Sequence, residues 1–336
     1  MLDQLVHHRD LSEAEAAHLL SSLTNSELAP AMAGALLAAL RAKGVTAAEI
    51  RGFAGAMRAL ARKPEFAVGL DAIDIVGTGG DASGSLNLST GAALLTAACG
   101  LPVIKHGNRA STSRSGSADL IEALGFTLPL NEVQAAQCFN ATGFTFLFAP
   151  YFHPAMKAIA PIRAAIGIRT VFNLLGPLTN PAAPRYRLIG AYDAATAELM
   201  ADALVGMDVA RAWVVHGAAG WDEATPIGPF LAFDVQRDEI RRYEVDPREF
   251  NVQPCVAADL AGGDAAANLT ALLEVFAGRD RGAHLAALTL QCGLALFIAA
   301  RAPSIRAGID LAHTTIDSGR AYQWLQSLQQ FAAGCR

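Results

Sequence analysis

The spacing of apolar residues predicts helices, and no strand, in roughly the first 65 residues. The run LAPAMAGALLAALRAKG, residues 28–44, is apolar at helical spacing, and its final glycine is the predicted C-cap. The capping-box pairs Ser12–Glu15 and Thr46–Glu49 predict the starts of two further helices. Consecutive helices without a strand predict a small helical domain at the N-terminus.

Beyond about residue 70, short β-rich runs alternate with helical runs, a pattern typical of an α/β domain with a mainly parallel sheet. The predicted strands span residues 72–76, 102–106, 144–149, 187–193 and 211–217. Residues 229–245 are predicted to form a hairpin of two strands joined at Gln236–Asp238. Roughly the last 70 residues are predicted to be helical again.

We therefore expect the α/β fold class, with a small helical N-terminal domain and a large α/β domain around a mainly parallel central sheet. The helical domain is predicted to span residues 1–68, with a further helical contribution from about 160–182. The α/β domain is predicted to span residues 69–336. The proline-rich stretch 176–184 is interpreted as a loop or a crossing between the two domains.

The composition narrows the class of protein. Of the 336 residues, 52% are hydrophobic and 17% are charged, which indicates a globular protein with a large core. The net charge of −5, without a block of like charges, argues against a nucleic-acid partner. Five scattered cysteines suit a reducing cytoplasm rather than a disulfide framework or a zinc ribbon. The polar N-terminus and the short apolar stretches predict a soluble cytoplasmic protein without a signal peptide or membrane span.

A glycine-rich turn follows the first predicted strand, in the stretch DIVGTGGDASGSLNLST at 74–90. Glycines let the backbone approach a ligand closely, and the N–H groups at the start of the next helix bind anions. Asn87, Ser89 and Thr90 add polar side chains, and Ser89 can also place an oxygen on a metal ion. The spacing matches neither the dinucleotide nor the Walker pattern. The alternative interpretation is a tight turn before a capped helix.

A second polar stretch, KHGNRASTSRSGSAD at 105–119, begins with Lys105 at the end of an apolar strand. Cations, hydroxyl groups and glycines in one loop suit the binding of a polyphosphate. The alternative is a solvated serine-rich loop, which the emergence of Lys105 from an apolar strand makes less attractive.

Three more features suggest chemistry or a local structural role. Arg163 lies among apolar helix positions, where a guanidinium can hold a carboxylate through two hydrogen bonds or simply be structural. His153 precedes Pro154, and a hydrogen-bonding role at a helix start is favoured for it. The adjacent Asp222 and Glu223 follow a predicted strand and suit Mg²⁺, although such pairs are commonly just solvated.

Taken together, these stretches resemble the anthranilate phosphoribosyltransferases of tryptophan biosynthesis. The resemblance rests on GTGGD followed by NLST, KHGNR followed by SGSAD, FHPAM followed by PIR and IRTVFNLLGPLTNP, and the pair DE, all in the family's order. It covers about residues 5–330. It implies a fold shared with pyrimidine nucleoside phosphorylases, an active site between the helical and α/β domains, Mg²⁺ as the cofactor, and a homodimer through the helical domain.

The resemblance also implies the residues of the site. Phosphoribosyl pyrophosphate (PRPP) would be held by Gly77, Gly80, Asp81, Ser85, Asn87, Leu88, Ser89, Thr90, Lys105, His106, Gly107, Asn108, Arg109, Ala110, Ser111, Thr112, Ser113 and Ser117. Anthranilate would be held by Gly77, Asn108 and Arg163, and Mg²⁺ by Ser89, Asp222 and Glu223. Lys105, Asp222 and Glu223 would be catalytic, because they or the metal offset charge on the leaving pyrophosphate.

The implied reaction transfers phosphoribose from PRPP to anthranilate, giving N-(5-phosphoribosyl)anthranilate and pyrophosphate. The alternatives are transfer to a different aromatic acid, or a catalytically inactive relative that binds nucleic acid. The chain departs from the family at Ala82, Leu86, Ala110 and Ser111, and we expect these departures to affect affinity and acceptor choice more than the reaction class. If Ala82 has a positive φ, alanine costs about 1 kcal/mol or more there.

Overall fold

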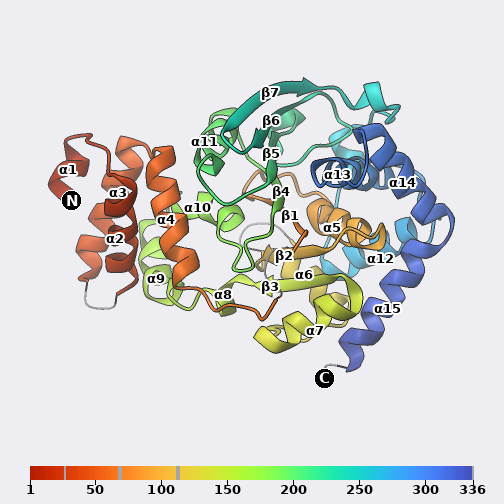
Figure 1. Ribbon diagram of the computed structural model, residues 1–336, viewed down its shortest axis with the longest axis horizontal. Coiled ribbons are helices and arrows are strands. Elements are labelled where there is room, and N and C mark those ends of the chain that lie inside the picture. The colour runs from red at the N-terminus through yellow and green to blue at the C-terminus, as the bar shows by residue number, and fades with distance from the viewer. Residues whose placement is uncertain (26–27, 67–69, 111–113, 335–336) are drawn as a thin grey trace.

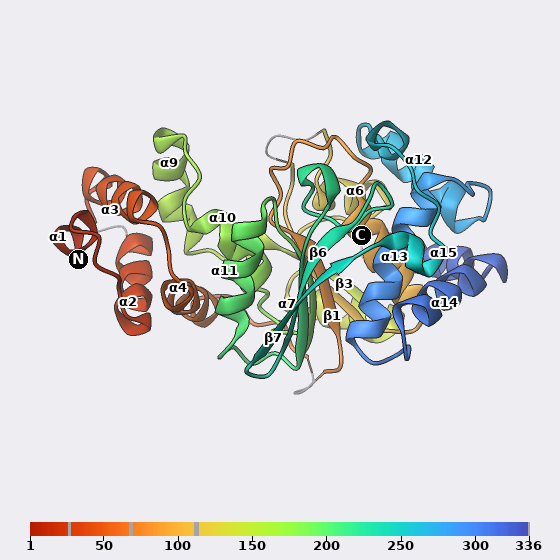
Figure 2. The ribbon, with the colours of Figure 1, turned by 90° about the horizontal axis from the view of Figure 1, so that it is seen from above.

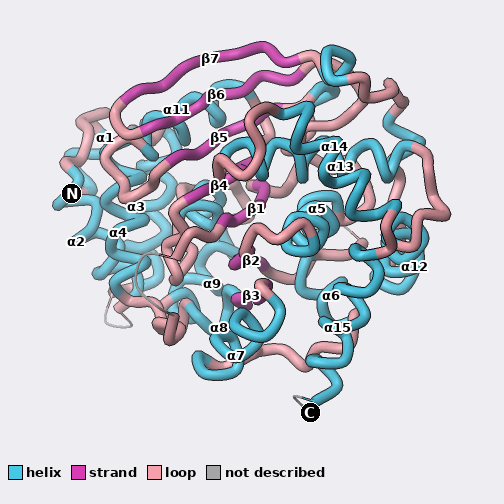
Figure 3. The backbone as a smooth tube through the Cα atoms, turned by 45° about the vertical axis from the view of Figure 1, so that its right-hand side comes forward, coloured by secondary structure: helices cyan, strands magenta, loops and turns pink. Residues whose placement is uncertain are grey.

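The computed structural model describes residues 1–25, 28–66, 70–110 and 114–334. A seven-stranded sheet in the order β3-β2-β1-β4-β5-β6-β7 lies at its centre (Figure 3). The strands are β1 Ile73–Gly77, β2 Val103–Gly107, β3 Phe144–Phe148, β4 Tyr186–Gly190, β5 Arg211–His216, β6 Phe230–Gln236 and β7 Glu239–Val245. The first five pair in parallel, and β6 and β7 pair antiparallel, which confirms the predicted mainly parallel sheet and its terminal hairpin.

The strand order reverses beside β1. The chain runs outward from β1 through β2 to β3, and then returns to place β4 on the other side of β1. Gly77 at the end of β1 pairs with Gly190 at the end of β4. In open parallel sheets a ligand site forms beyond the carboxyl ends of the strands at such a switch point. The loop that follows Gly77 therefore stands where this topology places a site.

The N-terminal segment forms helices, as the apolar spacing predicts (Figure 1). They are α1 Leu2–Val6, α2 Glu13–Thr24, α3 Pro30–Lys43 and α4 Ala47–Ala59. Both predicted capping boxes are present, at Ser12–Glu15 and at Thr46–Glu49, and Gly44 is the C-cap of α3 with φ +85°.

A later segment joins these helices. It comprises α8 Ala149–Phe152, α9 Met156–Ile166, α10 Phe172–Leu175 and the 3-10 turn Gly176–Leu178. Helix α9 packs against α2 and α3, and α10 packs against α4 (Figure 2). Helices α9 and α10 overlap the stretch at about 160–182 for which a further helical contribution is expected. The exact boundary between two domains stays a prediction.

The remaining helices flank the sheet or cover its far side. They are α5 Leu88–Ala98, α6 Ser117–Ala123, α7 Glu132–Thr142, α11 Ala194–Leu204, α12 Ala265–Phe276, α13 Ala283–Ile298, α14 Ile305–Asp317 and α15 Arg320–Gly334. In Figure 2 the sheet is seen nearly edge-on, with α4, α10 and α11 on one side and α12, α13 and α14 on the other.

The two faces of the sheet belong to two clusters of buried residues. Ile189 packs in the cluster that contains the N-terminal helices, whereas its neighbour Leu188 packs in the cluster that contains α5 and α13. Successive side chains of a strand point to opposite faces, so one strand serves both clusters. The helical bundle therefore shares a core with the sheet. No helix in the described parts of the chain is long and apolar enough to cross a membrane.

Candidate active site

The glycine turn after β1 is shaped by a carboxylate from a distant loop. A Cβ atom on Gly77 would lie 2.3 Å from Oδ2 of Asp222, so no larger residue fits unless Asp222 moves. The same Oδ2 accepts a hydrogen bond of 2.6 Å from the backbone N–H of Gly79. Gly79 and Gly80 have φ of +71° and +79°, which glycine adopts without strain. These glycines thus bring Asp222 onto the turn.

Ala82 has φ +56° and lies in the left-handed region. An alanine in this conformation costs about 1 kcal/mol or more relative to glycine. The substitution is therefore not neutral for the backbone. Asp81, just before it, accepts a hydrogen bond of 3.1 Å from the backbone N–H of Ser83, which helps to hold the strained turn.

Glu223 connects the same loop to the start of α5. Its Oε1 accepts a hydrogen bond of 2.9 Å from the backbone N–H of Ser89. Burial raises the pKa of both Asp222 and Glu223; Asp81 adds to the effect at Asp222, and Asp222 adds to it at Glu223. A positively charged side chain or a bound cation would offset the free-energy cost of burying two ionised carboxylates side by side.

Lys105 is the predicted cation of the site, and it lies buried in β2. Its ammonium group donates a hydrogen bond to the backbone carbonyl of Ile75 in β1. Burial lowers the pKa of Lys105 to about 8, and the carboxylates of Asp74, Glu223 and Asp222 oppose that shift. Lys105 is thus a buried cation whose charge interacts with both carboxylates of the pair.

The oxygen atoms at this position fit a hard divalent cation. Asp222 and Glu223 each commit one carboxylate oxygen to a backbone N–H group, and the Ser89 residue lies beside Glu223. Within the described residues, no set of three or more His, Cys, Asp or Glu side chains is placed to hold a metal by itself. Mg²⁺ commonly binds through one or two carboxylates, waters and substrate phosphates, so two carboxylates suffice.

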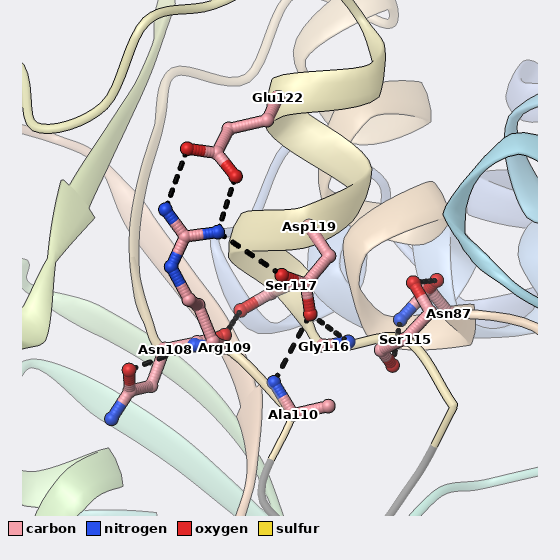
Figure 4. Close-up of polar contacts among 9 residues, drawn as sticks. All are labelled: Asn87, Asn108, Arg109, Ala110, Ser115, Gly116, Ser117, Asp119 and Glu122. Carbon is pink, nitrogen blue, oxygen red and sulfur yellow. Dashed lines mark hydrogen bonds and ion pairs between the residues drawn. The ribbon is translucent and has the colours of Figure 1, made fainter.

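The second predicted loop is held at both ends by one residue (Figure 4). Oδ2 of Asp119 accepts hydrogen bonds from the backbone N–H groups of Ala110, at 3.1 Å, and Gly116, at 2.8 Å. Burial works against ionisation of Asp119, but the two N–H groups and the guanidinium of Arg109 together lower its pKa. The predicted PRPP residues Ser111, Thr112 and Ser113 lie outside the described residues. Sequence reasoning missed Asp119, although its position three residues after Gly116 is a capping signal.

The side chain of Arg109 faces carboxylates within its own loop and helix. It donates to both oxygens of Glu122 and, at 3.2 Å, to Asp119 (Figure 4). Its guanidinium also lies 5.5 Å from the ring centre of Phe148. In the structure Arg109 is therefore an ion-paired residue of the loop base.

The two loops are joined through Asn87. Its Nδ2 donates to the carbonyl of Ser115 at 2.9 Å, and its Oδ1 accepts from the Ser115 hydroxyl at 3.0 Å. Asn268 of α12 donates to the same Oδ1 at 2.8 Å. Asn268 is buried and was not anticipated, because nothing in its local sequence distinguishes it from other helical asparagines.

Arg163, predicted to hold the acceptor, lies on α9 with its guanidinium 5.2 Å from the ring centre of Phe172. Within the described residues it makes no ion pair or side-chain hydrogen bond, and burial lowers its pKa. No hydrogen bond joins it to Asn108 or Gly77 in that part of the chain. The structure brings the first loop, Lys105 and the carboxylates together. Arg163 instead lies on α9, on the side of the N-terminal helices, which is called the helical side below.

Arg169 connects the segment after α9 to the glycine turn, and sequence reasoning missed this contact. Its guanidinium donates to the carbonyl of Gly80 at 2.5 Å and lies 4.0 Å from the ring centre of Tyr192. A Cβ on Gly80 would stand 2.8 Å from the same guanidinium. The segment after α9 thus rests on the glycine turn, so that α9 and the turn are linked.

Two buried histidines lie between the sheet and the helical side. The rings of His106 and His153 meet edge to face with centres 5.1 Å apart. Burial lowers the pKa of His106 to about 3 and that of His153 to about 4. The carbonyl of His153 accepts from the backbone N–H of Met156 at 3.0 Å, but this contact involves the backbone alone, so the hydrogen-bonding role of the His153 side chain stays a prediction.

Comparison with known proteins places this geometry in context. The model described as "Glycosyl transferase family, helical bundle domain" matches residues 1–61, and "Glycosyl transferase family, a/b domain" matches residues 69–322. The anthranilate phosphoribosyltransferase of Rubrobacter xylanophilus shares 44% sequence identity with this chain. The matched region covers 96% of this chain and 92% of that protein.

Two solved structures extend the similarity to three dimensions. The anthranilate phosphoribosyltransferase of Thermus thermophilus superposes with a TM-score of 0.92 at 39% identity, over 99% of each chain. The Saccharomyces cerevisiae enzyme in complex with PRPP and Mg superposes with a TM-score of 0.88 at 27% identity, over 96% of this chain and 94% of that one.

Proposed function

This chain belongs to the glycosyl transferase family, among relatives that are anthranilate phosphoribosyltransferases, and we propose that it transfers phosphoribose from PRPP to anthranilate. The products are N-(5-phosphoribosyl)anthranilate and pyrophosphate. The observation that carries this proposal is the carboxylate pair Asp222–Glu223, hydrogen-bonded to the glycine turn and to the start of α5 with Lys105 close by. This reaction is a step in the biosynthesis of tryptophan.

The donor is proposed to bind where the two loops meet. Backbone N–H groups of glycine turns and of first helical turns commonly bind anions, and here those of Gly79 and Ser89 already hold the carboxylates of Asp222 and Glu223. The Asn87–Ser115 link keeps the two loops in register, and Asp119 closes the base of the second loop. This arrangement supports the proposed PRPP residues on both loops.

Cleavage of the donor places growing charge on the pyrophosphate leaving group. Mg²⁺, when held by Ser89, Asp222 and Glu223, would supply electrostatic stabilisation of that charge. The charge of Lys105 interacts with both carboxylates, and its lowered pKa of about 8 reflects burial. The residues of the chain orient the donor and neutralise charge, and these effects account for most of the rate enhancement that the site can provide.

The acceptor is proposed to approach from the helical side. The guanidinium of Arg163, which has no carboxylate partner within the described residues, suits the carboxylate of anthranilate. The aromatic amine is neutral at pH 7 and can attack C1 of the ribose without a strong base. The Arg169 contact with Gly80 links this side to the donor turn and helps to set the distance between the two substrates.

Two further properties are proposed from separate observations. The helical domain is proposed to form a homodimer, because Val6 and Met32 expose apolar side chains on α1 and α3. A cytoplasmic location is proposed because the five cysteines show no disulfide pattern.

The experiment that tests the function follows the fluorescence of anthranilate during reaction with PRPP and Mg²⁺. The same assay is run with a panel of other aromatic acids. Loss of the anthranilate signal, with release of pyrophosphate in equal amount, is expected. Turnover of another acceptor but not of anthranilate would replace the acceptor assignment. No turnover of any acceptor, with strong salt-sensitive DNA binding, would instead support the inactive relative.

A further inference from the structure

A small cavity lies beside the carboxylate pair, on the side of α13. Ser89, Asp222, Glu223 and Gln291 are among the residues that line it. Its volume is about 10 Å³, which is roughly the room that one water molecule needs. Gln291 is the residue of this cavity that comes from α13, and none of the sequence motifs includes it.

Gln291 is an exception on its helix. Helix α13 has the sequence AHLAALTLQCGLALFI and is buried along most of its length. The hydroxyl of Thr289, two residues earlier, is satisfied by the carbonyl of Leu285 at 2.8 Å. Gln291 is only 2% exposed, and its Nε2 has no hydrogen-bond partner among the described residues. A buried amide without a partner destabilises a fold, so its presence calls for a physical reason.

The position of the amide supplies that reason. Asp222 is held by Gly79 and Glu223 is held by Ser89, so both carboxylates are fixed from the side of the glycine turn and α5. Gln291 reaches the same cavity from α13, so its amide faces the carboxylate pair from the other side. Residues that orient metal-binding carboxylates through hydrogen bonds typically affect metal affinity without touching the metal.

We propose that Gln291 is a positioning residue for the metal-binding carboxylates, acting through its amide across this cavity. The proposal rests on the proposed function, because it extends the proposed metal site by one residue. It explains why an amide without a hydrogen-bond partner among the described residues is buried in this apolar helix. It also predicts opposite effects of one substitution on stability and on metal binding.

The test uses Gln291→Met, which keeps the length of the side chain and removes the amide. In metal-free protein the Tm should rise by about 1–3 °C, because an unpartnered buried amide has been removed. Binding of Mn²⁺, followed by loss of the free-ion EPR signal in the presence of pyrophosphate, should weaken about 10–100-fold. Thr289→Val is the matched control on the same helix, and it should leave Mn²⁺ binding unchanged.

Kinetics provide a second readout. At saturating substrates Gln291→Met should raise the Mg²⁺ concentration for half-maximal rate, while the KM for anthranilate changes less than twofold or so. Gln291→Asn keeps the amide and should restore part of the Mn²⁺ affinity, which keeps the test informative if the Met variant does not fold.

Two results would overturn the proposal. One is a lower Tm of Gln291→Met with Mn²⁺ binding like that of the unchanged protein, which would make Gln291 a structural residue. The other is equal loss of Mn²⁺ binding in the Thr289→Val control. If the unchanged protein fails to consume anthranilate, the proposed function fails, and the Tm and EPR measurements still decide the role of Gln291.

Discussion

Oδ2 of Asp222 accepts a hydrogen bond of 2.6 Å from the backbone N–H of Gly79, although the two residues are 143 positions apart in the chain. This contact joins the loop after β5 to the loop after β1, next to the point where the strand order reverses. The conformation of the glycine turn and the position of the proposed metal site are thus parts of one arrangement.

Gly77→Ala should damage activity through Asp222. The added Cβ would stand 2.3 Å from Oδ2 of Asp222, so the carboxylate must move by about an ångström. A displacement of that size can cost about 100-fold in rate, and we expect kcat/KM to fall by roughly that factor. Gly55→Ala on α4, where a Cβ meets nothing within 4 Å, is the control. Activity of Gly77→Ala close to that of the unchanged protein would show that Asp222 need not stay in place.

Ala82→Gly should stabilise the protein. Because Ala82 has φ +56°, glycine relieves strain, and we expect the free energy of unfolding to rise by about 0.5–1 kcal/mol. Urea denaturation measures this difference. Ala31→Gly, at an exposed position within α3, should lower stability by about 1 kcal/mol instead. Equal destabilisation by both substitutions would contradict the assigned strain.

Asp119→Ala should weaken donor binding more than acceptor binding. Its carboxylate holds the N–H groups of Ala110 and Gly116 at the two ends of one loop. We expect the KM for PRPP to rise about tenfold, equivalent to about 1.4 kcal/mol, with a smaller change for anthranilate. Steady-state kinetics in both substrates measure the two values. Glu122→Ala removes one carboxylate partner of Arg109, leaves Asp119 in place and should have the smaller effect; the reverse order would assign the loop base to Arg109.

Arg163→Met should weaken acceptor binding more than donor binding, which is the opposite of the effect expected for Asp119→Ala. The guanidinium is proposed to hold the carboxylate of anthranilate, so the KM for anthranilate should rise at least tenfold or so while the KM for PRPP changes little. The control is Arg185→Met, which removes a surface guanidinium that pairs with Asp71. A parallel loss for both substrates would indicate that Arg163 supports the fold rather than the acceptor.

Acid should destabilise the protein in part through its buried histidines. Burial lowers the pKa of His153 to about 4, so between about pH 6.5 and 4 the unfolded chain takes up a proton there that the folded chain does not. The free energy of unfolding therefore falls as the pH falls through this window. His153→Gln should make this fall shallower by about 1.4 kcal/mol per pH unit, as measured by urea denaturation at several pH values.

Much of the fold could be predicted because the local signals are strong. Capping boxes at Ser12 and Thr46 and the alternation of β-rich and helical runs each depend on residues near one another in the chain. The predicted strands appear within a few residues of their predicted bounds, and the hairpin connection is shorter than predicted. The site motifs could be recognised for the same reason, since each loop carries its own glycines, hydroxyls and charges.

The roles of Asn268, Arg169 and Gln291 could not be predicted from their surroundings in the sequence, whereas Asp119 carries a local capping signal. Asn268 matters because α12 brings it to Asn87, and Gln291 matters because α13 brings it to the carboxylate pair. A polar residue in a helix has many possible partners, and only the packing of the helices against the sheet selects one.

The sequence by itself determined the order of elements, the mainly parallel sheet and the residue types of the site. These properties follow from periodicity, from capping and from the chemistry of side chains that lie within one loop. Only the tertiary structure decided which distant groups meet, such as Asp222 with the glycine turn and Arg169 with Gly80. It also decided that Ala82 adopts a strained positive φ. The physical reason is that contacts between residues far apart in the chain depend on how whole elements pack, and local sequence carries little information about that packing.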